Sequence, residues 1–260
     1  MANNSEKGHA KNVANFSWLR EEVEGFGIAY NPGPADIRLN NLLTVESDLK
    51  VAMEGLADAL ADHKDAINAR QFAFEDLDKR CTRIIGEAIA SGADKKILAD
   101  LRHLVRKIRG KRAKPIKEEE IPPPETPFVE GKAPESDPAP KVRKSASQAS
   151  YDYQKEHFVQ MVSLIGKIPG YAPNEADMSM SGLEARILLL GNSTKLVYHT
   201  ISEVEKAREI RDRLLYKSFV GAVEIAVRVK NHVKSAFGHA SNQFKAVAQI
   251  DFKAQKYGGL

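Results

Sequence analysis

Tyr30-Asn31-Pro32-Gly33-Pro34-Ala35-Asp36-Ile37 has a second version further along the chain, at Tyr171-Ala172-Pro173-Asn174-Glu175-Ala176-Asp177-Met178. Shorter pairs occur in the same order along the two halves. They are Asn15-Phe16 with His157-Phe158, Asn68-Ala69-Arg70 with Lys206-Ala207-Arg208, and Ser91-Gly92-Ala93 with Phe237-Gly238-His239. Landmarks that recur in order are typical of an internal repeat. The sequence therefore predicts a duplicated chain.

Each repeat predicts a short helix, a very long helix and another short helix. In the first repeat Gly33 caps the long helix, Pro34 occupies its first position, and Asp36 faces the positive end of the helix dipole. Asn174 and Asp177 take the corresponding places in the second repeat. These residues predict where both long helices start.

Both long helices are predicted to stop at a glycine, Gly92 or Gly238, since glycine adopts the left-handed conformation that closes many helices. Asp94 and Ser241 can then cap the next helix. No proline interrupts either long segment. A continuous helix of nearly 60 residues would be roughly 85 Å long.

Apolar residues along the first long segment are spaced by three and four, which is typical of a coiled-coil heptad. The second segment shows the same spacing, with one shift near Phe219 that we interpret as a stutter within a continuous helix. We expect an all-α, elongated helical bundle with pseudo-twofold symmetry, in which the short helices cover only the ends. Its middle would expose apolar side chains that call for a partner chain. They are Ile67, Phe72, Phe74, Ile201, Ile210 and Leu214.

Proline divides the chain, since 8 of its 12 prolines lie between Pro115 and Pro140. A segment rich in Pro, Glu, Lys and Ser cannot bury enough apolar surface to fold alone. The predicted organisation has four parts. They are a disordered N-terminal arm (1–11), helical repeat 1 (12–110), a Pro/Glu/Lys-rich linker (111–148) and helical repeat 2 (149–257).

Composition excludes several classes of protein. No stretch approaches the roughly 20 apolar residues of a membrane-spanning helix, and the N-terminus lacks the apolar core of a secretion signal. We therefore expect a cytoplasmic protein with no membrane insertion. Cys81 is the single cysteine, so an internal disulfide and a cysteine metal cluster are both excluded.

Nothing in the sequence predicts catalysis, a cofactor or a metal site. The phosphate-loop, dinucleotide-binding and metalloprotease motifs are absent. The seven histidines are scattered, and Cys81 lies on the apolar face of a predicted helix, where it packs as a small hydrophobe. We therefore expect a protein that is not an enzyme.

Arg70 and Arg208 both fall within the apolar heptad positions of the long helices. A buried arginine needs carboxylates or carbonyls. Polar residues at such positions usually fix helix register, which is the interpretation we favour. An anion-binding site is the alternative. The candidate carboxylate partners are Glu75, Glu203, Glu205 and Glu209.

A run of cations extends from the last helix of repeat 1 into the linker without an acidic residue. It consists of Arg102, Arg106, Lys107, Arg109, Lys111, Arg112, Lys114 and Lys117. Such a run can follow the phosphates of a nucleic acid. Interleaved aromatic residues are absent, however, and the acidic 118–120 follows at once. A solvated helix end, stabilised by its own C-terminal dipole, is therefore the favoured interpretation.

The landmarks resemble those of a family of uncharacterised bacterial all-helical proteins. They are Asn12-Val13-Ala14-Asn15-Phe16, Tyr30-Asn31-Pro32, Asn68-Ala69-Arg70, 104–113, Tyr171-Ala172-Pro173-Asn174-Glu175 and 233–238. The resemblance implies a duplicated helical fold and a bacterial origin, and it implies no activity or catalytic residue.

The sequence favours a non-enzymatic structural or protein-interaction protein, such as a scaffold, that forms homo-oligomers through its long helices. The alternative is a nucleic-acid-associated protein that uses residues 102–117. A pore-forming or lipid-remodelling protein is a weaker third possibility, because the longest apolar run is only Ile187-Leu188-Leu189-Leu190.

Overall fold

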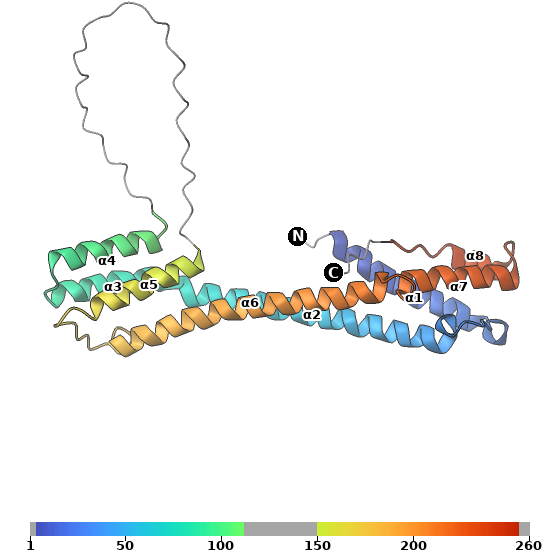
Figure 1. Ribbon diagram of the computed structural model, residues 1–260, viewed down its shortest axis with the longest axis horizontal. Coiled ribbons are helices and arrows are strands. Elements are labelled where there is room, and N and C mark those ends of the chain that lie inside the picture. Colours follow the sequence, from blue (N-terminus) through green and yellow to red (C-terminus); the bar gives the residue numbers. More distant parts are fainter. Residues whose placement is uncertain (1–3, 112–149, 255–260) are drawn as a thin grey trace, which may run out of the picture. The chain divides into compact units, whose positions relative to one another are not determined.

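A computed structural model describes residues 4–111 and 150–254 (Figure 1). In this part of the chain the regular elements are α-helices and short 3-10 helices, with no β-strand, so the predicted all-α class is confirmed. No helix among the described residues is both long and apolar enough to cross a membrane. The predicted linker lies outside the described residues, apart from Lys111.

The chain forms two compact units. Among the described residues, unit 1 contains 4–68 and 195–254, and unit 2 contains 69–111 and 150–194. The first half of the chain supplies α1 (Asn4–Gly25), η1 (Gly27–Ala29), η2 (Ala35–Ile37), α2 (Leu39–Glu75), α3 (Leu77–Ala90) and α4 (Lys95–Ile108). The second half supplies α5 (Tyr151–Ile165), α6 (Met180–Tyr216), α7 (Ala222–Phe237) and α8 (Asn242–Ala248). Each unit therefore combines helices from both halves of the chain.

The N-terminal arm predicted for residues 1–11 is wrong from Asn4 onward, because α1 begins there. His9 is only 2% exposed. Its imidazole Nδ1 lies 2.8 Å from Tyr216 Oη, and this contact with α6 fixes the first turns of α1. The charged and polar composition of this stretch of sequence favours disorder when it is considered alone. The contact between His9 and the distant Tyr216 orders the helix from Asn4 onward.

The predicted helices of nearly 60 residues are each divided in two. α2 and α6 are both 37 residues long, and α3 and α7 follow them as separate helices. In the second half the break includes Phe219, whose φ of 67° is left-handed, and Gly221. A Cβ atom at Gly221 would lie 2.7 Å from the Lys217 carbonyl oxygen, so only glycine fits this turn. The stutter predicted near Phe219 is therefore the end of a helix.

Both long helices start later than predicted. Pro34 precedes η2 instead of the long helix, and α2 begins only at Leu39. α6 begins at Met180, where the Ser179 hydroxyl accepts a hydrogen bond from the Gly182 amide at 3.1 Å. The intervening turn uses the repeated tyrosine, because Tyr30 Oη donates to the Ile37 carbonyl oxygen at 2.6 Å.

The predicted helix ends are confirmed. α3 ends just before Gly92, whose φ is 75°, and α7 ends at Gly238, whose φ is 89°. Asp94 then accepts a hydrogen bond from the Lys96 amide at 2.7 Å, which caps α4. Ser241 caps α8 in the same way through the Phe244 amide. A glycine at a helix end and a capping side chain at a helix start both act through neighbouring residues, so the sequence alone identifies them.

The core of unit 1 lies between α1, α2, α6, α7 and α8. On α1 the buried side chains recur every three or four residues, at Phe16, Leu19 and Val23. They pack in one cluster with side chains of α2 and α7 such as Leu49 and Val229. Each fully buried residue of this size stabilises the fold by about 1.5–3 kcal/mol.

The core of unit 2 is a separate cluster that joins the end of α2, α3, α4, α5 and the first part of α6. Phe158, Met161 and Ile165 of α5 are fully buried in it, as is Cys81 of α3. Phe74 belongs to this core and is 7% exposed, so the prediction that it faces outward is wrong. Its ring packs edge-on against Tyr151 of α5.

Candidate functional site

Arg70, one of the two predicted seam arginines, lies near the end of α2 in unit 2. Its guanidinium carbon lies 4.4 Å from the centre of the Tyr151 ring. Arg70 Nε is buried and makes no hydrogen bond, and within the described part of the chain Arg70 forms no ion pair. A cation–π contact with an aromatic ring therefore takes the place of the carboxylate partner that we predicted.

Arg208, the other predicted seam arginine, lies in unit 1 on an outer face of α6. It pairs with Glu205 one turn away at 2.8 Å, and its side chain is 37% exposed. The prediction that it occupies a buried position is wrong. Arg211, three residues later, is the buried arginine of this helix and pairs with Asp212. The two predicted arginines belong to different units.

A buried polar cluster that the sequence did not predict joins both ends of the chain in unit 1. Asn12 Nδ2 donates to Tyr216 Oη at 3.1 Å and to the Lys253 carbonyl oxygen at 2.8 Å. The Lys253 amide donates to Asn12 Oδ1 at 2.9 Å. Together with His9 these contacts hold the segment after α8 against α1. These hydrogen bonds stabilise the packing of elements within unit 1, which is a structural role.

The basic run is only partly within the described residues, since Arg112, Lys114 and Lys117 lie outside them. α4 buries Leu101, Leu104, Val105 and Ile108 and carries Arg102, Arg106 and Lys107 at its surface. Lys111 follows the helix and is exposed. Arg109 forms an ion pair with Asp78 of α3, and Arg106 donates to His103. Intramolecular partners thus engage two of these cations.

A shallow groove of about 520 Å³ lies between α4 and α5 in unit 2. Its polar lining includes His103, Lys107 and Gln160, and its apolar lining consists of Leu104, Val159 and Leu164. Partial burial, together with the nearby Arg106 and Lys107, lowers the pKa of His103. The groove therefore offers cationic and neutral donors, with the Asp100 carboxylate at the same rim.

A more apolar groove, of about 550 Å³, lies between α2 and α6 in unit 1. Hereafter it is called the α2/α6 groove. The α2 side consists of Asp48, Val51, Ala52, Gly55 and Ala59, and the α6 side consists of Glu203, Lys206, Ala207, Ile210 and Leu214. Both sets follow the spacing i, i+3, i+4, i+7 and i+11, which is one face of a helix. Val51 is 64% exposed and Ile210 is 44% exposed, so this apolar face is open to solvent.

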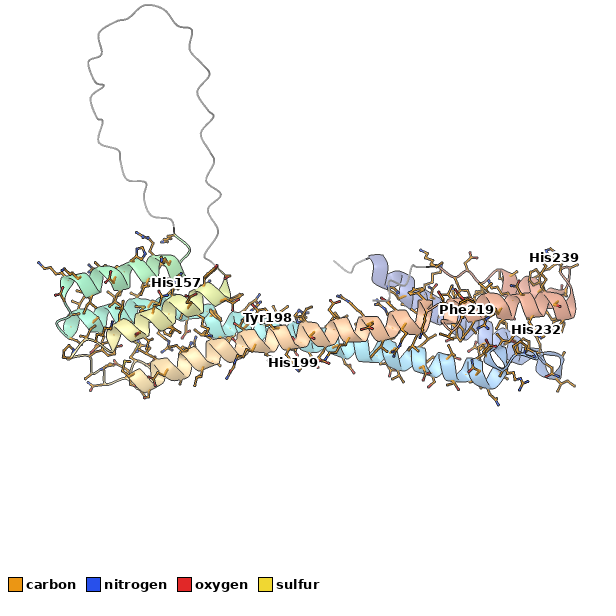
Figure 2. The ribbon with its side chains drawn as sticks, in the orientation of Figure 1. His157, Tyr198, His199, Phe219, His232 and His239 are labelled. Atoms are coloured by element: carbon orange, nitrogen blue, oxygen red, sulfur yellow. The ribbon has the colours of Figure 1, made fainter. Side chains whose placement is uncertain are left out.

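His9 lies close to two other titratable side chains in unit 1, Tyr216 and Asp212, with His9 Nδ1 3.8 Å from Asp212 Oδ1. Figure 2 shows His157, His199 and His232 on different helices. No three His, Cys, Asp or Glu side chains of the described residues could hold a metal ion together. Burial raises the pKa of the Cys81 thiol to about 12, so this thiol is protonated at neutral pH and is a poor nucleophile.

Comparison with known proteins adds no constraint on function. No protein-family description, curated protein sequence or solved structure matches this chain. The α2/α6 groove is thus the strongest candidate for a functional surface, on its geometry alone.

Proposed function

We propose that this chain is a non-enzymatic structural protein that acts through protein contacts, primarily with copies of itself. The α2/α6 groove is the observation that carries the proposal. Ordinary monomers leave single apolar side chains exposed, whereas here apolar residues of two helices line one concave surface. Ile201 and Ile210, which the sequence singled out, are exposed on α6. A cytoplasmic location and the resemblance to bacterial helical proteins remain part of the proposal.

The proposal includes an internal duplication with pseudo-twofold symmetry. Two matching hydrogen bonds support the duplication. Tyr30 Oη donates to the Ile37 carbonyl oxygen, and Tyr171 Oη donates to the Met178 carbonyl oxygen at 3.1 Å. In each case a 37-residue helix follows.

Two ion pairs with exchanged partners support the same duplication. Asp36, in the turn of the first half, pairs with Arg228 of α7 in the second half. Asp177, in the matching turn of the second half, pairs with Arg83 of α3 in the first half at 2.6 Å. Each half thus binds the other through the same kind of contact, as two copies of one ancestral unit would.

Light scattering after gel filtration tests the function. We expect the full chain to show a mass that rises from monomer towards dimer as its concentration is raised roughly a hundredfold, since self-association follows mass action. A monomer mass over the whole range would contradict the proposed function.

A nucleic-acid-associated role is the second candidate, and the exposed Arg102 and Lys111 favour it. Phosphate contacts would make such binding fall steeply with salt. Neutralising Arg106, Lys107, Arg109, Lys111 and Arg112 together should abolish salt-sensitive retention of a labelled oligonucleotide in a filter-binding assay. Unchanged retention would exclude this run as the binding surface.

A further inference from the structure

The two sides of the α2/α6 groove differ in side-chain size. The α2 side has small residues, Ala52, Gly55 and Ala59, along most of its length. The α6 side has the larger Ile210 and Leu214. Large side chains of one helix pack well into the hollows left by small residues on another. Each copy therefore carries both the large side chains, on α6, and the face of small residues, on α2, that such helix packing requires.

The two sides also differ in charge. Asp58 and Asp62 each lie three residues beyond a lining residue of α2, so they stand beside the groove, and Asp48 is in its lining. On the other side of the groove, Arg213 lies three residues beyond Ile210 on α6, and Lys217, three residues beyond Leu214, follows directly after the end of α6. Asp48 belongs to the lining, and the other four charged residues flank it. All five of these side chains are exposed.

The remaining charges of the lining largely cancel, because Lys206 forms an ion pair with Glu203 at 2.8 Å. By the same spacing, the exposed Glu54 adds to the acidic α2 side, whereas the exposed Glu209 lies beside the α6 side and leaves it with a small excess of positive charge. Two acidic sides facing each other would repel, whereas an acidic side facing a basic side attracts. Charge thus selects how a second copy can cover the groove.

We propose that the α2/α6 groove binds the same groove of a second copy, with α2 of each copy lying on α6 of the other. This inference rests on the proposed self-association and names its surface and orientation. A twofold axis parallel to the helices satisfies the charge pattern, and such an isologous contact is the commonest form of dimer. It brings four helices together across one apolar seam.

The register follows from the way the two helices run in unit 1. α2 and α6 run antiparallel there (Figure 1), and the 2.9 Å contact between His63 Nδ1 and Thr200 Oγ1 places these two residues at the same level. A twofold axis parallel to these helices leaves each residue of the second copy at the same height along the axis as in the first copy. Asp48 then lies level with Arg213 of the second copy. A twofold axis perpendicular to the helices, in the plane of the interface, would instead place α2 of one copy on α2 of the other. The acidic side chains of the two copies would then face each other.

The size of the surface sets the expected strength. The lining spans 12 residues of α2, Asp48 to Ala59, which is about 18 Å of helix, and two helices are about 20 Å across. The face is therefore on the order of 400 Å² per copy, about half of a standard interface. We expect a reversible dimer with a dissociation constant above about 10 μM, not a permanent one.

Sedimentation velocity of the full chain tests the surface, with substitutions that leave the monomer intact. Gly55→Arg adds bulk at a helix position where a Cβ atom meets nothing within 4 Å. Ile210→Glu puts a charge into the apolar seam. Each should weaken dimerisation at least tenfold. Leu188→Glu is the matched control, since Leu188 is 65% exposed on α6 but outside the groove, and it should have no effect.

Charge reversal tests the orientation. Asp48→Lys and Arg213→Glu should each weaken the dimer, and the double variant should restore it to within about twofold of the unmodified chain. Failure of the double variant to recover would overturn the orientation. A dimer unaffected by Gly55→Arg and Ile210→Glu would overturn the surface while leaving self-association intact. A monomer at every concentration, as expected if another protein fills the groove, would overturn both.

Discussion

The Tyr216 hydroxyl lies 2.8 Å from His9 Nδ1, although 207 residues separate the two along the chain. The same hydroxyl accepts a hydrogen bond from the buried Asn12. One phenol group therefore ties the start of α1 to the end of α6 in unit 1. The local stability of this part of the fold depends on it.

We predict that Tyr216→Phe destabilises unit 1 by about 1–3 kcal/mol, because buried hydrogen-bonding groups lose a partner while the ring remains in place. Urea unfolding followed by circular dichroism measures the change. Tyr153→Phe removes the hydroxyl of a tyrosine that is 45% exposed and should change the free energy of unfolding by less than about 0.5 kcal/mol. Equal effects of the two changes would contradict the role of Tyr216.

Glu46 makes stability depend on pH. Burial alone would raise its pKa, but hydrogen bonds from Arg20, Lys50 and Ser17 outweigh burial and lower it to about 2. The unfolded value is near 4.5, so the ionised carboxylate stabilises the fold above that pH. This contribution, at most about 3 kcal/mol, is lost as the pH falls from about 5 towards 2.

Glu46→Gln should therefore be less stable than the unmodified chain at pH 7, and the difference should shrink as the pH approaches 2.5. Urea unfolding at several pH values measures it. Glu54→Gln, at an exposed position of the same helix, should retain the pH dependence of the unmodified chain. A constant difference for Glu46→Gln across the range would refute the ion-pair explanation.

The exchanged ion pairs predict a residue-specific titration. The hydrogen bond from Arg83 is the main reason that the pKa of Asp177 is lowered. Arg83→Gln should raise that pKa towards its ordinary value, measured by NMR from the carboxylate carbon shift. Arg228→Gln removes the corresponding arginine in unit 1 and should leave the Asp177 titration unchanged. A shift in both variants would mean that the two ion pairs are not independent.

Two glycines should respond in opposite ways to alanine. At Gly221 a Cβ atom would lie 2.7 Å from the Lys217 carbonyl oxygen, so Gly221→Ala should destabilise the protein by more than about 1 kcal/mol. At Gly86, within α3, a Cβ atom meets nothing within 4 Å, so Gly86→Ala should stabilise it by about 0.5–1 kcal/mol. Thermal unfolding of both variants checks the signs. Two stabilising changes would show that the turn before α7 tolerates a side chain.

The sequence predicted those features of the fold that depend on neighbouring residues. Gly92 and Gly238 end helices because a positive φ suits glycine, whatever lies around them. The break at Phe219 was missed, because a left-handed phenylalanine has no local signal and depends on the crowded turn at Gly221. The order of α1 was missed for a related reason, since the partner of His9 is on a distant helix.

The functional surface was only partly predictable. Ile210 was expected to be exposed, but apolar spacing alone does not distinguish a helix face in a core from one in an open groove. The predicted repeat also paired Arg70 with Arg208, whereas the buried arginine of α6 is Arg211. Arg208 and Arg211 lie three residues apart on the same helix, and the apolar spacing alone does not show which of them the neighbouring helices bury.

Cysteine cross-linking between copies shows directly whether α2 of one copy lies on α6 of the other. Cys81→Ser removes the only native thiol, and Val51→Cys and Ile210→Cys are then introduced on separate chains, at exposed sites on opposite sides of the groove. If α2 of one copy lies on α6 of the other, mild oxidation of the mixture should give disulfide-linked dimers far in excess of those from either chain alone. A mixture that gives no more linked dimer than the separate chains would contradict the account.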